Sequence, residues 1–324
     1  MDKRNAALHR AKREKNDEFY TQKKDIENEL IHYHSQLKDK IVYCNCDDYR
    51  KSKFVEYFME NFDKIGLKKL ISTGFSKDGQ GTYSEYDGTI FKTGFLSGNG
   101  DALGEECTEI LKQADVVITN CPFSLFRKYV THLMKYGKKF LIIGNMNAIT
   151  YKEIFPYIKN NELWTGYKSF SGGMNFYVDE ANYDATLEKQ KSKIIDGHIV
   201  KNIMGCCWFT NLEHNKRNEE LILYKHYNPT EYPKYDNYNA IEVGKVAEIP
   251  MDYEGIMGVP ISFLDKYCPT QFEIVDAREV ALNDKQKNKS TYLIKDADGA
   301  INGKPTYARI CIRRKKAEPI VEVK

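Results

Sequence analysis

Short apolar runs alternate with amphipathic stretches through the first half of the chain. Each apolar run has the length of a buried strand, and each amphipathic stretch repeats apolar residues at helical spacing. Strands are predicted, in chain order, at residues 41–44, 69–73, 115–119 and 140–144. Helices are predicted after them at residues 52–65, 105–112, 124–135 and 151–159. This alternation predicts an α/β fold with a parallel sheet covered by helices on both faces.

Outside these elements the chain follows other patterns. Residues 2–15 are typical of a basic helix, residues 25–37 of an amphipathic helix, and residues 83–91 of a hairpin that turns at Asp87-Gly88. Beyond about residue 161, strand-like pieces alternate with loops rich in Tyr, Asn and Pro. These pieces are residues 203–210, 221–224 and 308–312. We expect a smaller C-terminal α+β region there.

Three polar clusters lie where predicted strands end, at residues 45–48, 98–101 and 120–123. In open parallel sheets the ligand binds at the carboxyl ends of the strands. One such cluster would carry little weight, but three of them favour a single shared pocket at this edge of the sheet.

The composition is that of a globular protein, with 41% hydrophobic and 29% charged residues. No apolar run approaches the roughly 20 residues that a membrane helix needs. The N-terminus lacks the apolar segment of a secretory signal. We therefore expect a cytoplasmic protein with no membrane partner.

The cysteines and histidines do not indicate a metal site. The eight cysteines include two close pairs, Cys44/Cys46 and Cys206/Cys207, and neither pair has CxxC spacing. The seven histidines show no HxxxH-type pattern. We expect reduced, mostly buried thiols and no bound metal.

Basic side chains gather at both ends of a chain whose net charge is only +3. Six lie in residues 1–15 and five in residues 309–316. Two basic ends on a near-neutral body fit a surface that faces phosphates. Solvated termini explain the same distribution equally well.

The segment Asn120-Cys121-Pro122-Phe123 follows a buried strand and opens a helix. It resembles the Asn-Pro-Pro-Phe/Tyr signature of amino-group methyltransferases. An exocyclic amine is a poor nucleophile because its lone pair is delocalised into the ring. Two acceptors, the Asn120 side-chain oxygen and the carbonyl of residue 121, would favour the more tetrahedral nitrogen of the transition state. Phe123 would stack on the base, which must leave the duplex to reach this loop.

The cysteine in this segment keeps alternatives open. Cytosine-C5 methyltransferases use a cysteine nucleophile, but their signature is Pro-Cys and the order here is Cys121-Pro122. A purely structural alternative is a helix-opening Asn with proline in the first turn. Replacement of the usual proline by Cys121 also keeps a catalytically inactive, DNA-binding relative in view.

Five segments in order give a closer resemblance, to the EcoRI-type adenine-specific DNA modification methylases of the gamma class. It runs from about residue 14 to about residue 315. The segments are residues 16–21 (NDEFYT), 44–54 (CNCDDYRKSKF), 114–126 (ADVVITNCPFSLF), 207–212 (CWFTNL) and 255–265 (GIMGVPISFLD). The resemblance implies a Rossmann-like methyltransferase sheet, S-adenosyl-L-methionine as methyl donor, and N6-methyladenine in double-stranded DNA as product.

The resemblance also assigns roles by position. Asn120, Cys121, Pro122 and Phe123 would form the target-base pocket. The cofactor-binding candidates are Phe19, Tyr20, Thr21, Asp47, Asp48 and Asp101. The usual Gly-x-Gly loop is missing, and residues 44–48 stand in its place. The choice between Asp47 and Asp48 stays open, and a loop or helix-capping role is the alternative for each.

Trp208 and Phe209 form an aromatic pair in a strand-like stretch. In gamma-class enzymes an aromatic residue from a later motif sandwiches the flipped base, so either ring is a candidate for base stacking beside Phe123. Because strand side chains alternate between faces, we expect at least one of the two in the core.

Three parts of the chain follow from this interpretation. Residues 1–38 would hold the N-terminal basic helices and the cofactor-contacting segment, residues 39–215 the catalytic domain, and residues 216–324 the DNA target-recognition region. The resemblance implies a monomer that acts in a restriction-modification system or as a solitary methylase. A restriction endonuclease would be linked to it only through a shared site. The alternative substrates are RNA or a protein amide nitrogen.

Overall fold

The computed structural model describes residues 20–169, 172–177, 192–195, 198–289 and 292–315. The chain divides into two compact units. The first unit comprises Met1–Ala148 and Thr165–Glu213, and the second comprises Ile149–Trp164 and His214–Lys324. The second unit thus includes residues 149–164, which the sequence analysis grouped with the catalytic domain. The predicted helix at residues 2–15 lies outside the described residues.

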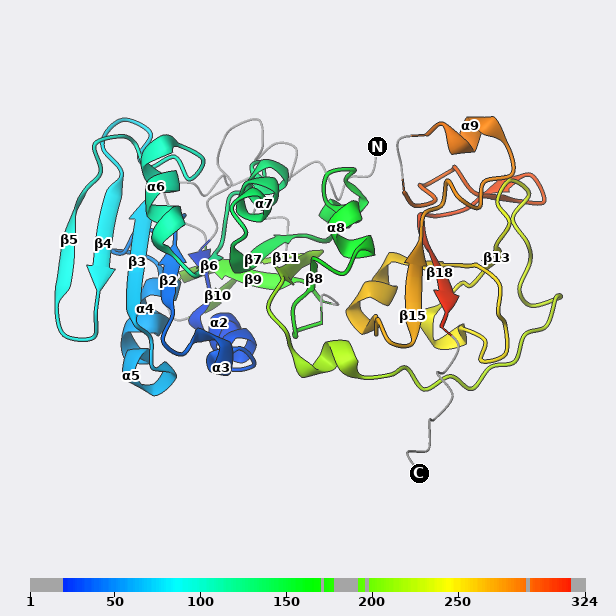
Figure 1. The fold of residues 1–324 in the computed structure, drawn as a ribbon, viewed down its shortest axis with the longest axis horizontal. Helices are drawn as coiled ribbons and strands as arrows, with labels where there is room; N and C mark the ends of the chain where they lie inside the picture. Colours follow the sequence, from blue (N-terminus) through cyan, green and yellow to red (C-terminus); the bar gives the residue numbers. More distant parts are fainter. Residues whose placement is uncertain (1–19, 170–171, 178–191, 196–197, 290–291, 316–324) are drawn as a thin grey trace, which may run out of the picture. The chain divides into compact units, whose positions relative to one another are not determined.

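Eight strands of the described residues form one mixed sheet (Figure 1). In spatial order they are β5 (Phe91–Phe95), β4 (Thr82–Tyr86), β3 (Lys69–Gly74), β2 (Ile41–Cys44), β6 (Val116–Thr119), β7 (Lys139–Asn145), β12 (Cys206–Thr210) and β8 (Trp164–Thr165). Strands β3, β2, β6 and β7 run parallel to one another. Strands β4, β5 and β12 are antiparallel to their partners. The predicted α/β fold with a parallel central sheet is confirmed.

Helices pack on both faces of this sheet because its strands are apolar on both faces. Along β12, Trp208 contacts Phe54 of α4, whereas its neighbour Phe209 contacts Phe126 of α7. Alternate side chains therefore point to opposite faces. Among its described residues, the helices of this unit are α2 (Lys23–Leu30), α3 (His34–Leu37), α4 (Lys53–Glu60), α5 (Phe62–Ile65), α6 (Glu105–Gln113) and α7 (Phe126–Lys135).

Two predicted helices are interrupted in the structure. The one expected at residues 25–37 is split into α2 and α3 by a turn at residues 31–33. The one expected at residues 52–65 begins at its N-cap Ser52 but breaks at Asn61, where α4 gives way to α5. It ends at Gly66, whose φ of 74° is a left-handed conformation that favours glycine.

A second sheet of the first unit joins distant segments of the chain. Its order is β1 (Tyr20–Thr21), β9 (Met174–Tyr177), β11 (His198–Ile203) and β10 (Ser192–Ile195). In the antiparallel β1–β9 pair, Thr21 lies opposite Phe176. This pairing carries the N-terminal segment to residues more than 150 positions away along the chain.

The second unit is built on a four-stranded sheet of order β13 (Ile241–Glu242), β14 (Met257–Pro260), β18 (Arg309–Arg314) and β15 (Phe272–Val275) (Figure 1). The small hairpin β16 (Ala300–Ile301) and β17 (Lys304–Pro305) and the helices α8 (Phe155–Lys159) and α9 (Asp284–Lys287) complete its regular elements with short 3-10 turns. Strand β18 confirms the prediction at residues 308–312.

The strand predicted at residues 221–224 was wrong. Ile222 is 91% exposed, and residues 221–224 form no strand. The Gln271 side chain occupies the backbone groups of Leu221, accepting from its N–H and donating to its carbonyl at 2.8 Å each. The side-chain amide of Gln271 makes the hydrogen bonds that a neighbouring strand would make. The spacing of apolar residues in the sequence cannot predict such a contact.

Three further features of the described residues bear on the sequence analysis. No helix among them is long and apolar enough to cross a bilayer. No cluster of His, Cys, Asp and Glu in the same residues is arranged to hold a metal ion. All eight cysteines are free thiols, and seven of them are buried.

Candidate functional site

The carboxyl ends of β2, β3 and β6 are tied together by Asp47. This buried side chain accepts a hydrogen bond from Ser52 Oγ on Oδ1 at 2.7 Å and one from Thr119 Oγ1 on Oδ2. Its backbone N–H donates to the Thr73 carbonyl at 2.8 Å. Ser52 caps α4, and Thr119 directly precedes Asn120. Asp47 therefore joins the start of α4 to the strand that delivers Asn120.

Burial raises the pKa of Asp47 to about 6, even though the hydrogen bonds from Thr119 and Ser52 favour its ionised form. Removal of the carboxylate from water destabilises its ionised form by more free energy than the two hydroxyl donors contribute to it. The effect on stability has a definite sign. The folded chain holds the proton more tightly than the unfolded chain, so this contribution to stability is full at low pH and is lost as the pH rises through about 6.

This pKa gives a prediction for Asp47→Asn. The free energy of unfolding of the wild type minus that of the variant should fall by roughly 2.5 kcal/mol between pH 4 and pH 7, because the shift is about two pKa units. Urea unfolding of both proteins across this range measures the difference, and the other titrating groups cancel. A difference that does not change with pH would show that Asp47 ionises without a burial cost.

Asp48 has different surroundings from its neighbour. Its carboxylate is half-buried and accepts from Arg50 Nη2 at 2.6 Å and from Arg50 Nε at 2.9 Å. Burial raises the pKa of Asp48, but the hydrogen bonds and charge of Arg50 outweigh burial and leave the pKa below its usual value. Asp48 is thus an ionised acceptor at neutral pH, with part of its surface open to solvent.

Glycines bring the loop that carries Asp101 against the loop that carries Asp48. A Cβ on Gly74, at the end of β3, would lie 2.7 Å from the Asp48 Cα. A Cβ on Gly100 would lie 2.4 Å from the Gly74 carbonyl oxygen, and Gly100 has a φ of 78°. Only glycine permits both approaches. The clusters at residues 45–48 and 98–101 therefore meet at one edge of the sheet.

The Asp101 side chain is exposed at this edge. Its Oδ1 accepts from the Leu103 N–H at 3.0 Å, and its carbonyl accepts from the Gly104 N–H at 2.8 Å. One carboxylate oxygen thus stabilises the turn before α6. The second oxygen is not used by that turn.

The loop at residues 120–123 lies between β6 and α7. Cys121 is 1% exposed, and its Sγ lies 3.9 Å from the Ile143 carbonyl in β7. The Pro122 carbonyl accepts from the Leu125 N–H at 2.9 Å and so begins the turn that leads into α7. The thiol is therefore buried against β7. The structure does not favour Cys121 as an exposed nucleophile.

Phe176 connects this loop to the N-terminal segment. The Phe123 and Phe176 rings pack edge-to-face, with centroids 6.5 Å apart, and Phe176 pairs with Thr21 across the β1–β9 ladder. Thr21 is buried, and its Oγ1 has no hydrogen-bond partner among the described residues. Phe19 lies outside the described residues, and Tyr20 is placed by its backbone pairing with Tyr177. Phe123 and Thr21 thus border the same ring.

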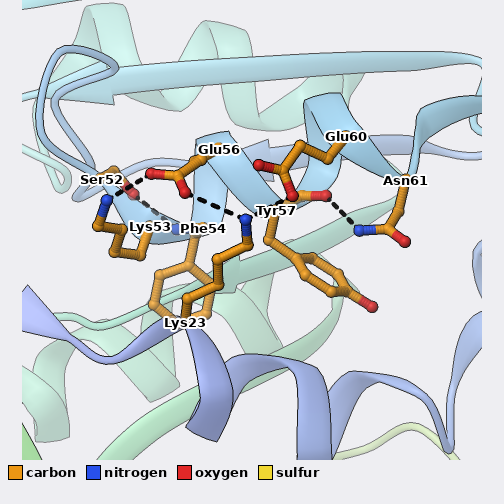
Figure 2. A network of polar contacts seen from close by, with 8 residues as sticks. All are labelled: Lys23, Ser52, Lys53, Phe54, Glu56, Tyr57, Glu60 and Asn61. Atoms are coloured by element: carbon orange, nitrogen blue, oxygen red, sulfur yellow. Dashed lines mark hydrogen bonds and ion pairs between the residues drawn. The ribbon is translucent and has the colours of Figure 1, made fainter.

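Ion pairs join Lys23, the first residue of α2, to helix α4 (Figure 2). Lys23 Nζ lies 3.1 Å from Glu56 Oε1 and 2.5 Å from Glu60 Oε2. Lys53 Nζ reaches the other oxygen of Glu56 at 2.5 Å. These groups are partly exposed, so their pairing adds little stability but sets an orientation. Helix α4 therefore pairs with Lys23, two residues after Thr21, through Glu56 and Glu60. Its N-cap Ser52 donates to Asp47.

Asn45 is a site residue that the sequence placed in a polar cluster without a role. It is fully buried, and its Oδ1 accepts from the Tyr129 hydroxyl of α7. Its Nδ2 finds no hydrogen-bond partner among the residues described. A buried donor without a partner costs free energy, which makes Asn45 Nδ2 a candidate donor to a bound ligand.

Other contributors carried weaker signals in the sequence. In the sequence, Thr119 is simply the last residue of a predicted buried strand, and the hydrophobic pattern does not connect it with Asp47. Phe176 lies in a region where the periodicity fades. Only the three-dimensional pairing of the strands places these two residues beside the clusters.

Trp208 and Phe209 are both in the core. Neither has exposed surface, and the two rings pack on opposite faces of the sheet against Phe54 and Phe126. The core position expected for at least one of them therefore holds for both. Of the three candidates for base stacking, Phe123 is only partly buried and therefore has surface available to a base.

The arrangement suits group transfer to a planar amine. Asn120 and the carbonyl of residue 121 supply acceptors on one loop, and Phe123 supplies a ring beside them. Ionised Asp48 and exposed Asp101 lie along the same edge of the sheet and can accept from hydroxyl or amino groups of a second ligand.

Comparison with known proteins identifies relatives along nearly the whole chain. The model of the family described as adenine-specific methyltransferase EcoRI matches residues 7–95 and 83–315. The chain is 43% identical to the type II methyltransferase M.EcoRI of Escherichia coli, over 97% of this chain and 98% of that protein. It is 40% identical to the type II methyltransferase M.MgeORF184P of Mycoplasma genitalium, over 95% and 99%. No solved structure matches the chain.

Proposed function

The chain belongs to the EcoRI family of adenine-specific methyltransferases, and from this premise we propose how its residues perform the reaction. It is a site-specific DNA methyltransferase that modifies adenine. The proposal concerns the residues of the target-base pocket, the binding of S-adenosyl-L-methionine, and the part of the chain that reads DNA. The observation that carries it is the meeting of three polar clusters at one edge of the sheet.

Asn120 and the residue-121 carbonyl bind the N6 amino group of an adenine that has left the duplex. Each accepts one N–H, which draws the nitrogen lone pair out of conjugation as the new bond forms. Phe123 stacks on the base and compensates for its lost neighbours. Asp47 does not touch the base. It holds Thr119 and thereby fixes the residue that precedes Asn120.

S-adenosyl-L-methionine would supply an activated methyl group on a sulfonium. The adenine N6 nitrogen forms the new N–C bond as the S–C bond breaks, the cofactor leaves as a thioether, and the excess proton passes to solvent. The residues at the edge of the sheet fit such a ligand. Asp48 and Asp101 offer carboxylate oxygens to ribose hydroxyls and amino groups, and the Thr21 hydroxyl and Asn45 Nδ2 are buried polar groups without partners among the described residues. Phe19 and Tyr20 belong to the same segment as Thr21. We assign Asp48 as the cofactor contact because its carboxylate keeps surface open to a ligand, whereas Asp47 is buried and both of its oxygens accept from the protein.

Thr21→Val tests the assignment of the N-terminal segment. The variant keeps the shape of the side chain but loses the hydroxyl, so the Kd for S-adenosyl-L-methionine should rise about 5- to 30-fold, as expected for one hydrogen bond to a charged or polar ligand. Isothermal titration calorimetry measures the Kd, and Thr21→Ser, which keeps the hydroxyl, is the matched control. Equal affinity in the wild type and Thr21→Val would remove Thr21 from the cofactor site.

The substrate of the proposal is double-stranded DNA, and the second unit supplies target recognition. This proposal is supported by the match of the family model, which runs through residue 315 and so covers the second unit as well as the first. Lys and Arg side chains would contact phosphates, and other side chains would read bases. A protomer that modifies one strand per visit can act as a monomer, and a cognate restriction endonuclease would meet it only through the shared site.

A base-flipping assay tests the target-base pocket. A duplex with 2-aminopurine in place of the target adenine should become brighter on binding, because the base leaves the stack. Phe123→Ala should still bind the duplex but methylate an ordinary target more slowly, since the flipped base loses the ring that holds it in the pocket. No rise with the wild type, on DNA that it binds specifically, would contradict the proposed pocket.

A further inference from the structure

Arg278 is held rigidly at the edge of the second unit. Its Nε donates to Asp276 Oδ1 at 3.0 Å and its Nη2 to Asp276 Oδ2 at 2.6 Å, a two-point pairing. The Asp276 side chain is 6% exposed, whereas the Arg278 side chain is 37% exposed. The anchor is therefore buried and the guanidinium reaches the surface.

An aromatic ring supports the same guanidinium from one face. Arg278 Cζ lies 4.2 Å from the centroid of the Tyr292 ring. Tyr292 is itself fixed, because its carbonyl accepts from the Ala277 N–H at 2.9 Å and its ring stacks on Phe155 of α8. The Asp276 Oδ1 also accepts from the Arg278 N–H at 2.9 Å. Tyr292 thus constrains the plane of the guanidinium, and Asp276 constrains both its Nε–Nη2 edge and the backbone N–H of Arg278.

The pairing leaves one end of the fork outside the ion pair. Asp276 takes the Nε and one N–H of Nη2, so the Nη1 end of the guanidinium is not used by the carboxylate. A planar pair of donors at that end matches two adjacent acceptors in one plane. Guanine presents such a pair, O6 and N7, in the major groove of DNA.

The charge of the pair favours a neutral acceptor over a phosphate. Asp276 compensates the positive charge of Arg278, and its own negative charge lies 2.6 Å from the guanidinium. A phosphate would meet this carboxylate as a like charge nearby. The charge compensation by Asp276 does not remove the N–H donors at the Nη1 end of the guanidinium or change their planar arrangement. The pair is therefore better suited to base reading than to backbone binding.

Two other arginines of the second unit show the contrast. Arg309 is 9% exposed, and it gives Nε and Nη2 to Glu242 and Nη1 to the Ala308 carbonyl, so it is a structural residue. Arg313 pairs with a single oxygen of Glu273, and no aromatic ring supports it among the described residues. Among these arginines, Arg278 combines a plane fixed by Asp276 and by the ring and hydroxyl of Tyr292, an Nη1 end that Asp276 does not use, and exposure.

We propose that Arg278, buttressed by Asp276 and Tyr292, reads one guanine of the DNA target through its Nη1 and Nη2 donors. The inference rests on the proposed function, because it requires that the second unit contacts DNA. It names a specificity-determining residue that neither the sequence motifs nor the family comparison assigns. Arg278 belongs to the second unit, whereas all the cofactor candidates belong to the first, so its loss should not change cofactor binding.

The test is the sequence preference of Arg278→Lys, which keeps the charge but loses the fork. Unmethylated genomic DNA is treated with the wild type and with the variant, and the modified positions are read by sequencing. The preference at one G·C pair should fall about 10- to 100-fold, as expected for one bidentate base contact, while other positions keep theirs. The Kd for S-adenosyl-L-methionine should be unchanged. The matched control is Glu279→Gln, an exposed charge on the same turn that pairs with Lys159.

A chemical probe isolates the contact. Each guanine of the determined site is replaced in turn by 7-deazaguanine, which lacks the N7 acceptor. One replacement should lower the wild-type rate, and Arg278→Lys should be insensitive to that same replacement. If Arg278→Lys fails to fold, Arg278→Gln takes its place in both experiments.

Three results would overturn the inference. They are a target without a G·C pair, an unchanged preference in Arg278→Lys, and, in the uncharged variant Arg278→Gln, a uniform loss of affinity whose dependence on salt is weaker by about one phosphate contact. Absence of N6-methyladenine with the wild type would instead count against the proposed function.

Discussion

Asn120→Ala is expected to lower turnover about 10²- to 10³-fold, the usual cost of one preorganised hydrogen-bonding group aimed at the transition state. The Kd for S-adenosyl-L-methionine should stay near its wild-type value. The reason is geometric. Asn120 stands one residue beyond Thr119, which Asp47 holds. In the proposed site its side chain binds the amine, whereas Asp48 and Asp101 bind the cofactor. Single-turnover methylation and calorimetry measure the two quantities separately.

Asn61→Ala is the matched control for this substitution. Asn61 ends α4, and its Nδ2 donates to the Tyr57 carbonyl at 2.9 Å (Figure 2). It loses the same amide in the same unit without touching the loop at residues 120–123, so turnover should be close to that of the wild type. If Asn120→Ala lost cofactor affinity and turnover in equal measure, Asn120 would be a structural residue of the loop.

Gly100→Ala is expected to lower the free energy of unfolding by roughly 2–5 kcal/mol and to weaken cofactor binding at least tenfold. Two costs add at this position. The φ of 78° is unfavourable for any side chain, and a Cβ would lie 2.4 Å from the Gly74 carbonyl oxygen, which belongs to the backbone and has little room to move. The loop of Asp101 must then separate from the loop of Asp48. Urea unfolding and calorimetry of the same samples test both effects.

Gly137→Ala separates the two costs. Gly137 has a similar φ of 62°, but nothing lies within 4 Å of its missing Cβ. It should lose only about 1–2 kcal/mol, the cost of the left-handed conformation, and it should bind cofactor normally. Equal destabilisation by the two substitutions would mean that the close approach of the two loops has no energetic consequence.

The central sheet could be predicted because its strands are continuous apolar runs. The strands at residues 41–44 and 116–119 are buried on both faces, so they give a strong local signal. The turns that follow them hold the polar clusters, and the rule that ligands bind at the carboxyl ends of parallel strands placed those clusters together. This reasoning needs only residues that are neighbours along the chain.

What joins distant segments could not be predicted in this way. The β1–β9 ladder, which sets Thr21 opposite Phe176, depends on two short strands with no periodicity of their own. The roles of Asp47 and Asp48 look identical in the sequence. Their difference arises because Ser52 and Thr119 surround one carboxylate while Arg50 pairs with the other.

The aromatic pair shows a related limit. Trp208 and Phe209 have the composition of a base-stacking site, but each ring faces a different helix. Burial of both was decided by helices α4 and α7, which cover the two faces of β12. A strand pattern predicts that the two side chains point apart, and it does not predict that both faces are covered.

The most direct test of the account is methyl transfer itself. The wild-type protein is incubated with labelled S-adenosyl-L-methionine and unmethylated genomic DNA, and the DNA is then digested to nucleosides for analysis. The account predicts the label in N6-methyladenine, at a recurring sequence and at no other base. Label in 5-methylcytosine, or no label in DNA from a protein that binds the cofactor, would contradict it.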